Sequence, residues 1–227
     1  MKKFIDLSHD FYDGMPGYKM KNEDGTITQY TAKIKPCLTH EQSLAKYEGK
    51  ASFEITEMSF QCSVGTYLDS PYHRYQEKRD ISELQLEEMI LPGILIDVRE
   101  KEAYEAVGID VIEKGTDLRG KAILFNFGWD VYWGTDKYYS YPYISEDLIN
   151  YLFAEGVKLV GVDTVNIDSI KDPCRPAHSL FLENDILIVE NLTDLSKLKE
   201  KEFIFYAIPL KAKRTAVMPV RAFAEIV

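Results

Sequence analysis

The sequence predicts an α/β protein: a single domain, residues 1–227, built on a mixed β-sheet with flanking helices. Short apolar runs bounded by turn-forming residues are typical of buried strands, and they predict strands at residues 93–98, 121–127 and 157–162. Further strands are expected at 185–192, 202–210 and 221–227. Predicted strands clearly outnumber predicted helices. The 227 residues and 45% hydrophobic content suffice for one large core.

The amino-terminal part is more polar and its pattern is weaker. Residues 3–9 predict a strand that runs into a polar turn, which residues 14–17 (Gly-Met-Pro-Gly) close. Residues 29–38 predict the next strand. Residues 52–62 predict another, whose apolar positions change phase near Glu57, and this indicates a bulge or bend because a one-residue slip moves side chains to the other face.

Helices are expected in three places between the strands. Ser82 with Gln85 matches a capping box that opens a short helix before Pro92. Residues 108–114 predict a second small helix. A third helix begins after the capping residue Ser145 and ends at Gly156. Its buried face is expected to carry Leu148, Ile149, Leu152 and Phe153.

Charge and cysteine content limit the partners and the compartment. The net charge of −10 argues against nucleic acid or an anionic membrane as partner, since both require a basic surface. We identify no signal peptide and no apolar run that approaches the length of a membrane span. Cys37, Cys62 and Cys174 are odd in number and widely spaced, which predicts free or buried thiols in a reducing, cytoplasmic setting.

The segment with the most chemistry is Ser63–His73, which we expect to form a constrained loop after a strand. Its Asp69 carboxylate can bind a divalent cation, and its His73 imidazole can bind one or transfer a proton near neutral pH. Between them, Pro71 fixes one φ angle. The same residues could instead form a surface turn whose aspartate caps backbone amides. From spacing alone both interpretations remain open.

This segment resembles the His-x-Gly-Thr-His-x-Asp-x-Pro-x-His signature of the cyclase family of metal-dependent hydrolases, which includes kynurenine formamidase and isatin hydrolase. Residues 6–9 with 14–16, 127–129 and 161–163 also resemble segments of that family. Ser63 and Tyr67 stand where the family has two metal-binding histidines. The residues that match the signature are Gly65, Thr66, Asp69, Pro71 and His73.

The resemblance implies the swivelling β/β/α architecture and hydrolysis of a small amide, formamide or lactam, an arylformamidase-like reaction. It implies that Asp69, His178 and Glu190 hold one divalent ion, zinc or manganese, and that His73 is the catalytic acid and base. The alternative is an altered, non-catalytic family member that acts as a small-molecule binding protein.

The two replaced histidines predict a reduced metal site. A serine hydroxyl is a weak neutral ligand, and a tyrosine must lose a proton of high pKa before it binds a metal well. We therefore expect at most one tightly bound ion. Ser63 and Tyr67, together with Trp129, are assigned to substrate binding instead.

An aromatic segment follows Phe127-Gly128. Such dense rings can form a wall for an aromatic substrate or a subunit interface, and both interpretations remain open. Left exposed, the rings would form a large apolar surface, so we predict a homodimer or a higher homo-oligomer. The segment consists of Trp129, Tyr132, Trp133, Tyr138, Tyr139, Tyr141 and Tyr143.

Overall fold

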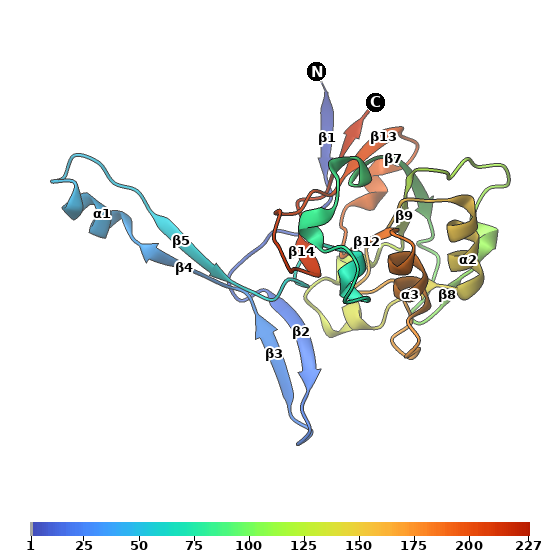
Figure 1. Cartoon of the computed structure of the whole chain (residues 1–227), viewed down its shortest axis with the longest axis horizontal. Coiled ribbons are helices and arrows are strands. Elements are labelled where there is room, and N and C mark those ends of the chain that lie inside the picture. Colours follow the sequence, from blue (N-terminus) through green and yellow to red (C-terminus); the bar gives the residue numbers. More distant parts are fainter. Residues whose placement is uncertain (1) are drawn as a thin grey trace. The chain divides into compact units, whose positions relative to one another are not determined.

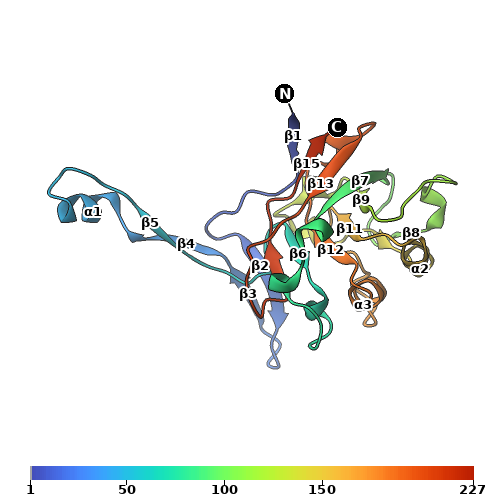
Figure 2. The ribbon, with the colours of Figure 1, turned by 45° about the horizontal axis from the view of Figure 1, so that its top comes forward.

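The computed structural model describes residues 2–227, apart from the side chains of Tyr18 and Lys21. The chain divides into two compact units. The larger unit contains the residues up to His9 together with Thr66–Val227, and the smaller unit contains Asp10–Gly65. Figures 1 and 2 label most strands and helices of both units.

The larger unit is built on a nine-stranded sheet, which confirms the predicted α/β class with a mixed sheet. Its four adjacent strands β7, β9, β11 and β12 are parallel, and the remaining neighbours pair antiparallel. In spatial order the strands are β1 (Lys3–Asp6), β15 (Phe223–Ile226), β13 (Phe203–Tyr206), β7 (Ile90–Asp97), β9 (Ala122–Asn126), β11 (Leu159–Val162), β12 (Leu187–Glu190), β6 (Tyr67–Asp69) and β14 (Val217–Pro219). A separate parallel pair joins β8 (Ala106–Val107) to β10 (Tyr143–Ile144).

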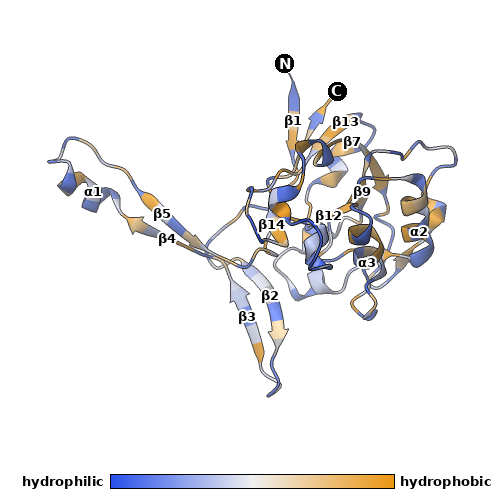
Figure 3. Cartoon of the chain, viewed as in Figure 1, coloured by the Kyte–Doolittle hydropathy of each residue, from blue (hydrophilic) through white to orange (hydrophobic). Residues whose placement is uncertain are grey.

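The central strands and two helices form the main core. Every residue of β9 and β11 is buried, as expected for parallel strands covered on both faces. Helices α2 (Glu146–Glu155) and α3 (Pro176–Glu183) contact each other and lie on the same side of the sheet (Figures 1 and 2). Figure 3 shows hydrophobic residues gathered along these elements.

Helix α2 has the predicted ends, but one residue predicted on its buried face is exposed. It follows Ser145 and ends at Gly156, whose φ of 77° is the left-handed conformation that glycine adopts most easily. Leu148 and Leu152 are buried as predicted, and so is Ile149. The prediction for Phe153 was wrong, because 41% of its surface is exposed.

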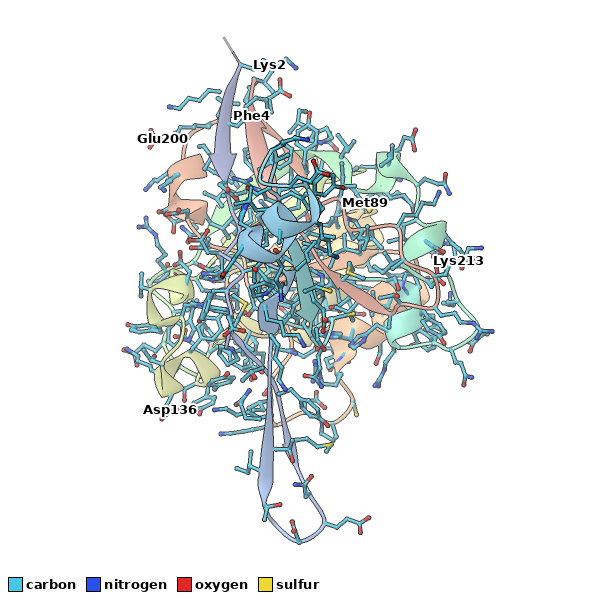
Figure 4. All side chains as sticks on the ribbon, turned by 90° about the vertical axis from the view of Figure 1, so that its left-hand side faces the viewer. Lys2, Phe4, Met89, Asp136, Glu200 and Lys213 are labelled. Carbon is cyan, nitrogen blue, oxygen red and sulfur yellow. The ribbon has the colours of Figure 1, made fainter. Side chains whose placement is uncertain are left out.

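One of the two edge strands of the sheet is β1. Phe4 points outward from this strand with 55% of its surface exposed, and its ring lies edge-on to Phe223 at 5.9 Å (Figure 4). Next to it, the Lys2 ammonium lies 2.6 Å from the Glu225 carboxylate. A charged residue at an exposed edge strand opposes pairing with further strands.

The smaller unit consists of two hairpins and a short helix. Hairpin β2 (Pro16–Lys21) and β3 (Ile27–Thr31) precedes hairpin β4 (Lys33–Leu38) and β5 (Ile55–Ser59), and α1 (His40–Lys46) lies between β4 and β5. The single strand predicted at 29–38 is therefore two strands. The expected irregularity near Glu57 lies in its partner strand, where the register shifts between Pro36 and Leu38.

Two local predictions near the signature segment were wrong. The capping box does not begin at Ser82: Asp80 accepts the Ser82 backbone N–H at 2.8 Å and opens the short 3₁₀ turn Ile81–Glu83, and Gln85 precedes a second such turn, Leu86–Glu88. The signature segment is not a continuous loop, because β6 pairs within the sheet between β12 and β14. After β6 the chain forms the 3₁₀ turn Pro71–His73.

The aromatic segment is largely part of the chain's own core. Trp129, Tyr138 and Tyr141 are buried there, and Tyr132 and Trp133 pack against it partly buried. The assumption that this segment would be exposed on a monomer was therefore wrong. Asp136, which lies between these aromatic residues in the chain, is exposed (Figure 4).

Within residues 2–227, none of the helices is both long and apolar enough to cross a membrane. The three cysteines are free thiols, as predicted; Cys37 and Cys174 are exposed, and Cys62 is partly exposed.

Candidate active site

The pairing of β6 with β12 brings two acidic residues of distant segments together. In this antiparallel pair Tyr67 lies opposite Glu190, and Asp69 lies opposite Ile188. Residues directly opposite each other share a face of the sheet, and so do residues two apart in one strand. Asp69 and Glu190 therefore project from the same face, and both are 1% exposed.

Helix α3 adds an imidazole to this face. Arg175 precedes the helix with a left-handed φ of 50°, and Pro176 is its first residue, a position that proline tolerates well. His178 follows in the first turn. Its Nε2 lies 3.7 Å from Asp69 Oδ2 and 3.6 Å from Glu190 Oε1. One potential ligand atom from each of these three residues lies within 4.8 Å of the other two.

The Asp69 carboxylate is the residue that most clearly requires a further partner. Both of its oxygens are buried, and neither has a hydrogen-bond partner among the described residues. A buried carboxylate without donors is strongly unfavourable, and native proteins satisfy such groups with hydrogen bonds, paired charges or metal ions. Two carboxylates and an imidazole at this spacing fit a divalent cation such as zinc or manganese.

The side chains of the cluster shift one another's pKa values. Burial, reinforced by the Asp69 charge, raises the pKa of Glu190 to about 7, although His178 and hydrogen bonds oppose the rise. Burial opposes protonation of His178, but its hydrogen bond to Asp168 and the nearby carboxylates raise its pKa to about 9. The carboxylates of Asp69 and Glu190 thus favour a positive charge in this buried site.

Tyr67 is engaged with a predicted metal ligand. Its hydroxyl donates a hydrogen bond to Glu190 Oε2 at 2.6 Å, and the Ile167 backbone N–H donates to Glu190 Oε1 at 2.9 Å. Burial, with the charges of Glu190 and Asp69, raises the pKa of Tyr67 well above its usual value. Tyr67 is therefore a protonated donor that orients Glu190, and the predicted contact between Tyr67 and substrate remains a prediction that requires this proton to change partner.

His73 lies beside the cluster and is accessible to solvent. Its ring centroid is 5.8 Å from that of His178, and the turn that carries it contacts α3. Although the side chain is exposed, neighbouring protein atoms displace part of the water around its ring, and this lowers the pKa of His73. The Asp69 charge opposes the effect, and the positive charges of His178 and Arg175 reinforce it. A neutral imidazole at the edge of the site can accept a proton near neutral pH.

Comparison with known proteins decides the family. Residues 5–169 match the family model described as "Putative cyclase", which is more than half of the chain. This chain belongs to the cyclase family. Among curated relatives, kynurenine formamidase of Bacillus thuringiensis (strain Al Hakam) is 26% identical over 192 residues, covering 81% of this chain and 85% of that protein. Kynurenine formamidase of Bacillus mycoides (strain KBAB4) is also 26% identical over the same shares.

Solved structures share the fold of this cyclase-family chain. An isatin hydrolase bound to the product analogue thioisatinate has a TM-score of 0.85 and 21% identity, covering 99% of this chain and 92% of that one. A potential metal-dependent hydrolase with cyclase activity has a TM-score of 0.76 and 21% identity, covering 99% and 98%. The family architecture implied by the signature segment is thus confirmed.

The remaining predicted site residues lie elsewhere. Trp129 is buried against Tyr132, with ring centroids 5.0 Å apart, and the Lys137 ammonium lies 5.7 Å from its ring centre. It lines a surface hollow of about 600 Å³ whose lining includes none of the three predicted ligands. Ser63 belongs to the smaller unit. Substrate contacts by either residue remain predictions.

The sequence interpretation assigned no role to Asp168. This buried carboxylate accepts the His178 ring N–H at Nδ1, 2.7 Å away, and the Ala177 backbone N–H, also at 2.7 Å. Although burial favours its neutral form, the contacts with His178 lower the pKa of Asp168. The available sequence signal was weak: an aspartate shortly after a strand and ten residues before a predicted histidine ligand.

Proposed function

We propose that this protein is a metal-dependent hydrolase that cleaves the C–N bond of a small amide, formamide or lactam. The observation that carries the proposal is the buried Asp69 carboxylate, which has no hydrogen-bond partner among the described residues and faces His178 and Glu190. The hydrolase names of the relatives support the same reaction class. Their names also favour an aromatic substrate.

Asp69, His178 and Glu190 would hold one divalent ion, zinc or manganese. When bound, such an ion lowers the pKa of water and polarises a carbonyl group. Tyr67 keeps Glu190 oriented through its hydroxyl. His73, neutral near pH 7 because its pKa is lowered, accepts a proton from the attacking water at a ring nitrogen and returns it to the leaving nitrogen.

We further propose that residues 1–227 act as one cyclase-family domain in the cytoplasm. The three free cysteines support a reducing compartment, since oxidising compartments favour disulfides. A homodimer or a higher homo-oligomer remains our proposal for the assembly. Large exposed apolar residues in the smaller unit support it, notably Ile27 at 68% and Met58 at 49% exposure.

The test separates chemistry from metal binding. Protein loaded with zinc or manganese is assayed on arylformamides and lactams. His73→Ala should retain the metal and lower turnover by about 10²–10⁴-fold, because it removes only the proton-transfer group. Glu190→Gln should lose the metal. His40→Ala, which removes an exposed imidazole bonded to Ser52 in the smaller unit, should leave both unchanged.

Wild-type protein that binds metal but hydrolyses none of these substrates would contradict the proposal and favour a small-molecule binding protein. Full activity of His73→Ala would contradict the assignment of the base alone.

A further inference from the structure

We infer that Asp168 is a positioning residue that holds the His178 ring with its proton on Nδ1 and its Nε2 directed at Asp69 and Glu190. The inference rests on the proposed function in one respect, namely that the three residues bind a metal. A histidine ligand commonly donates its other ring N–H to a carboxylate, which fixes the ring orientation and the tautomer.

The contacts between Asp168 and the first turn of α3 are numerous for one carboxylate. Asp168 is 1% exposed. Its Oδ1 accepts the Ala177 backbone N–H at 2.7 Å, and its Oδ2 accepts the His178 backbone N–H at 3.1 Å and lies 2.7 Å from His178 Nδ1. An ionised carboxylate has no proton to donate, so Nδ1 must carry the hydrogen of this bond.

Arg175 places a positive charge beside this carboxylate. Arg175 Nε lies 3.4 Å from Asp168 Oδ2. The left-handed backbone of Arg175, with φ 50°, is unusual for a residue with a side chain. Such strain persists only where surrounding contacts enforce it, and here it places the guanidinium beside the carboxylate.

The short segment that carries Asp168 contacts a second predicted ligand. The Ile167 backbone N–H donates to Glu190 Oε1 at 2.9 Å, while Asp168 contacts His178. The Asn166 side chain, in turn, accepts the Asp168 backbone N–H at 2.8 Å and shapes the turn. Three consecutive residues thus fix the relative placement of a carboxylate and an imidazole that are both predicted to bind the ion.

A purely structural explanation must be distinguished from this one. Asp168 also accepts hydrogen bonds from two backbone N–H groups at the amino terminus of α3, as a helix cap does. Loss of a cap lowers stability but does not change which ring nitrogen of His178 carries the proton. The decisive readouts are therefore the metal dissociation constant and the state of Nδ1.

The variants are Asp168→Ala and Asp168→Asn, with Asp163→Asn as a matched control. Asp163 is also fully buried and accepts three backbone N–H groups, those of Phe127, Gly128 and Trp129, but contacts none of the predicted ligands through its side chain. Each variant of the full chain is titrated with zinc against a chelating dye. In parallel, ¹⁵N-resolved NMR of labelled histidine follows the His178 Nδ1–H.

Asp168→Ala should raise the zinc dissociation constant by about 10–100-fold and abolish the hydrogen-bonded Nδ1–H signal. The zinc dissociation constant of Asp168→Asn should lie between those of the wild type and Asp168→Ala, because the amide oxygen can still accept a hydrogen bond from the His178 Nδ1–H. Asp163→Asn should keep the wild-type constant within about twofold, whatever its stability.

A zinc constant that is unchanged in both Asp168 variants would overturn the inference and leave Asp168 as a helix cap. If Asp168→Ala does not fold, Asp168→Asn decides by the same criterion. Wild-type protein that binds no zinc would instead refute the proposed function. In that case persistence of the Nδ1–H signal in Asp168→Ala would refute the role of Asp168 separately.

Discussion

Replacing Tyr67 with phenylalanine tests what its hydroxyl contributes beside the Glu190 carboxylate. The substitution removes the Tyr67 hydroxyl, which donates a hydrogen bond to Glu190 Oε2 at 2.6 Å. The buried Oε2 atom then loses this donor. Above the Glu190 pKa of about 7 the carboxylate is charged, and a hydrogen bond to a charged group contributes about 1.5–3 kcal/mol to the free energy of unfolding. Below that pKa the acceptor is neutral, and the contribution is about 0.5–1.5 kcal/mol.

The direction in which stability changes with pH follows from the difference in Glu190 pKa between the folded and unfolded chain. The pKa of Glu190 is raised from 4.5 to about 7 in the folded chain, so the stability that this group contributes is present at low pH and is lost as pH rises through the folded pKa. Tyr67 limits this loss because it favours the ionised form. Tyr67→Phe should therefore destabilise the metal-free chain more at about pH 8.5 than at about pH 5.5.

The assay is urea denaturation of metal-free protein at both pH values, with thermal melting in parallel. At high pH the melting temperature should fall by about 3–12 °C for a chain of this size. Tyr75→Phe is the control, since its hydroxyl donates to the neutral backbone carbonyl of Ser179 at 2.9 Å and its loss should not depend on pH. Equal destabilisation by Tyr67→Phe at both pH values would refute the reasoning.

Three further predictions concern the site and the assembly. With saturating metal, kcat/KM should fall as pH falls through the lowered pKa of His73, so the midpoint of the acidic limb should lie below 6.5, the usual histidine value; a midpoint above it would exclude His73 as the base. Elemental analysis should find no more than one tightly bound divalent ion per chain, and two in the wild type would contradict the ligand count. Light scattering at micromolar concentration should show at least a dimer, and a monomer would contradict the proposed assembly.

Short-range patterns in the sequence were sufficient for the central sheet. The runs at 93–98, 121–127 and 157–162 are mostly apolar because parallel central strands are covered on both faces, and each corresponds to a strand of the sheet. The ends of α2 were also predictable from a serine before the helix and a glycine after it. Gly156 ends the helix in the left-handed conformation, whereas the Ser145 hydroxyl donates to the Val107 carbonyl at 2.8 Å and makes no capping hydrogen bond. Family resemblance then supplied Asp69, His178 and Glu190, which lie together in the structure.

The strand register, in contrast, was decided only by the tertiary structure. Tyr67 and Glu190 are 123 positions apart, and their hydrogen bond exists because the three-residue strand β6 pairs with β12 in one particular register. So short a strand leaves little periodic signal, which explains why this segment was predicted as a loop. The role of Asp168 likewise depends on where α3 begins relative to the preceding turn.

Burial of the aromatic segment was also a tertiary outcome. Composition and spacing are the same whether Trp129, Tyr138 and Tyr141 line a surface or fill a core, and only packing against the central strands places them inside. The sequence by itself therefore determined which strands form the centre of the sheet, and its family resemblance indicated three residues of the candidate site. Long-range pairing and packing decided which residues meet, because contacts between distant segments leave no local pattern in the chain.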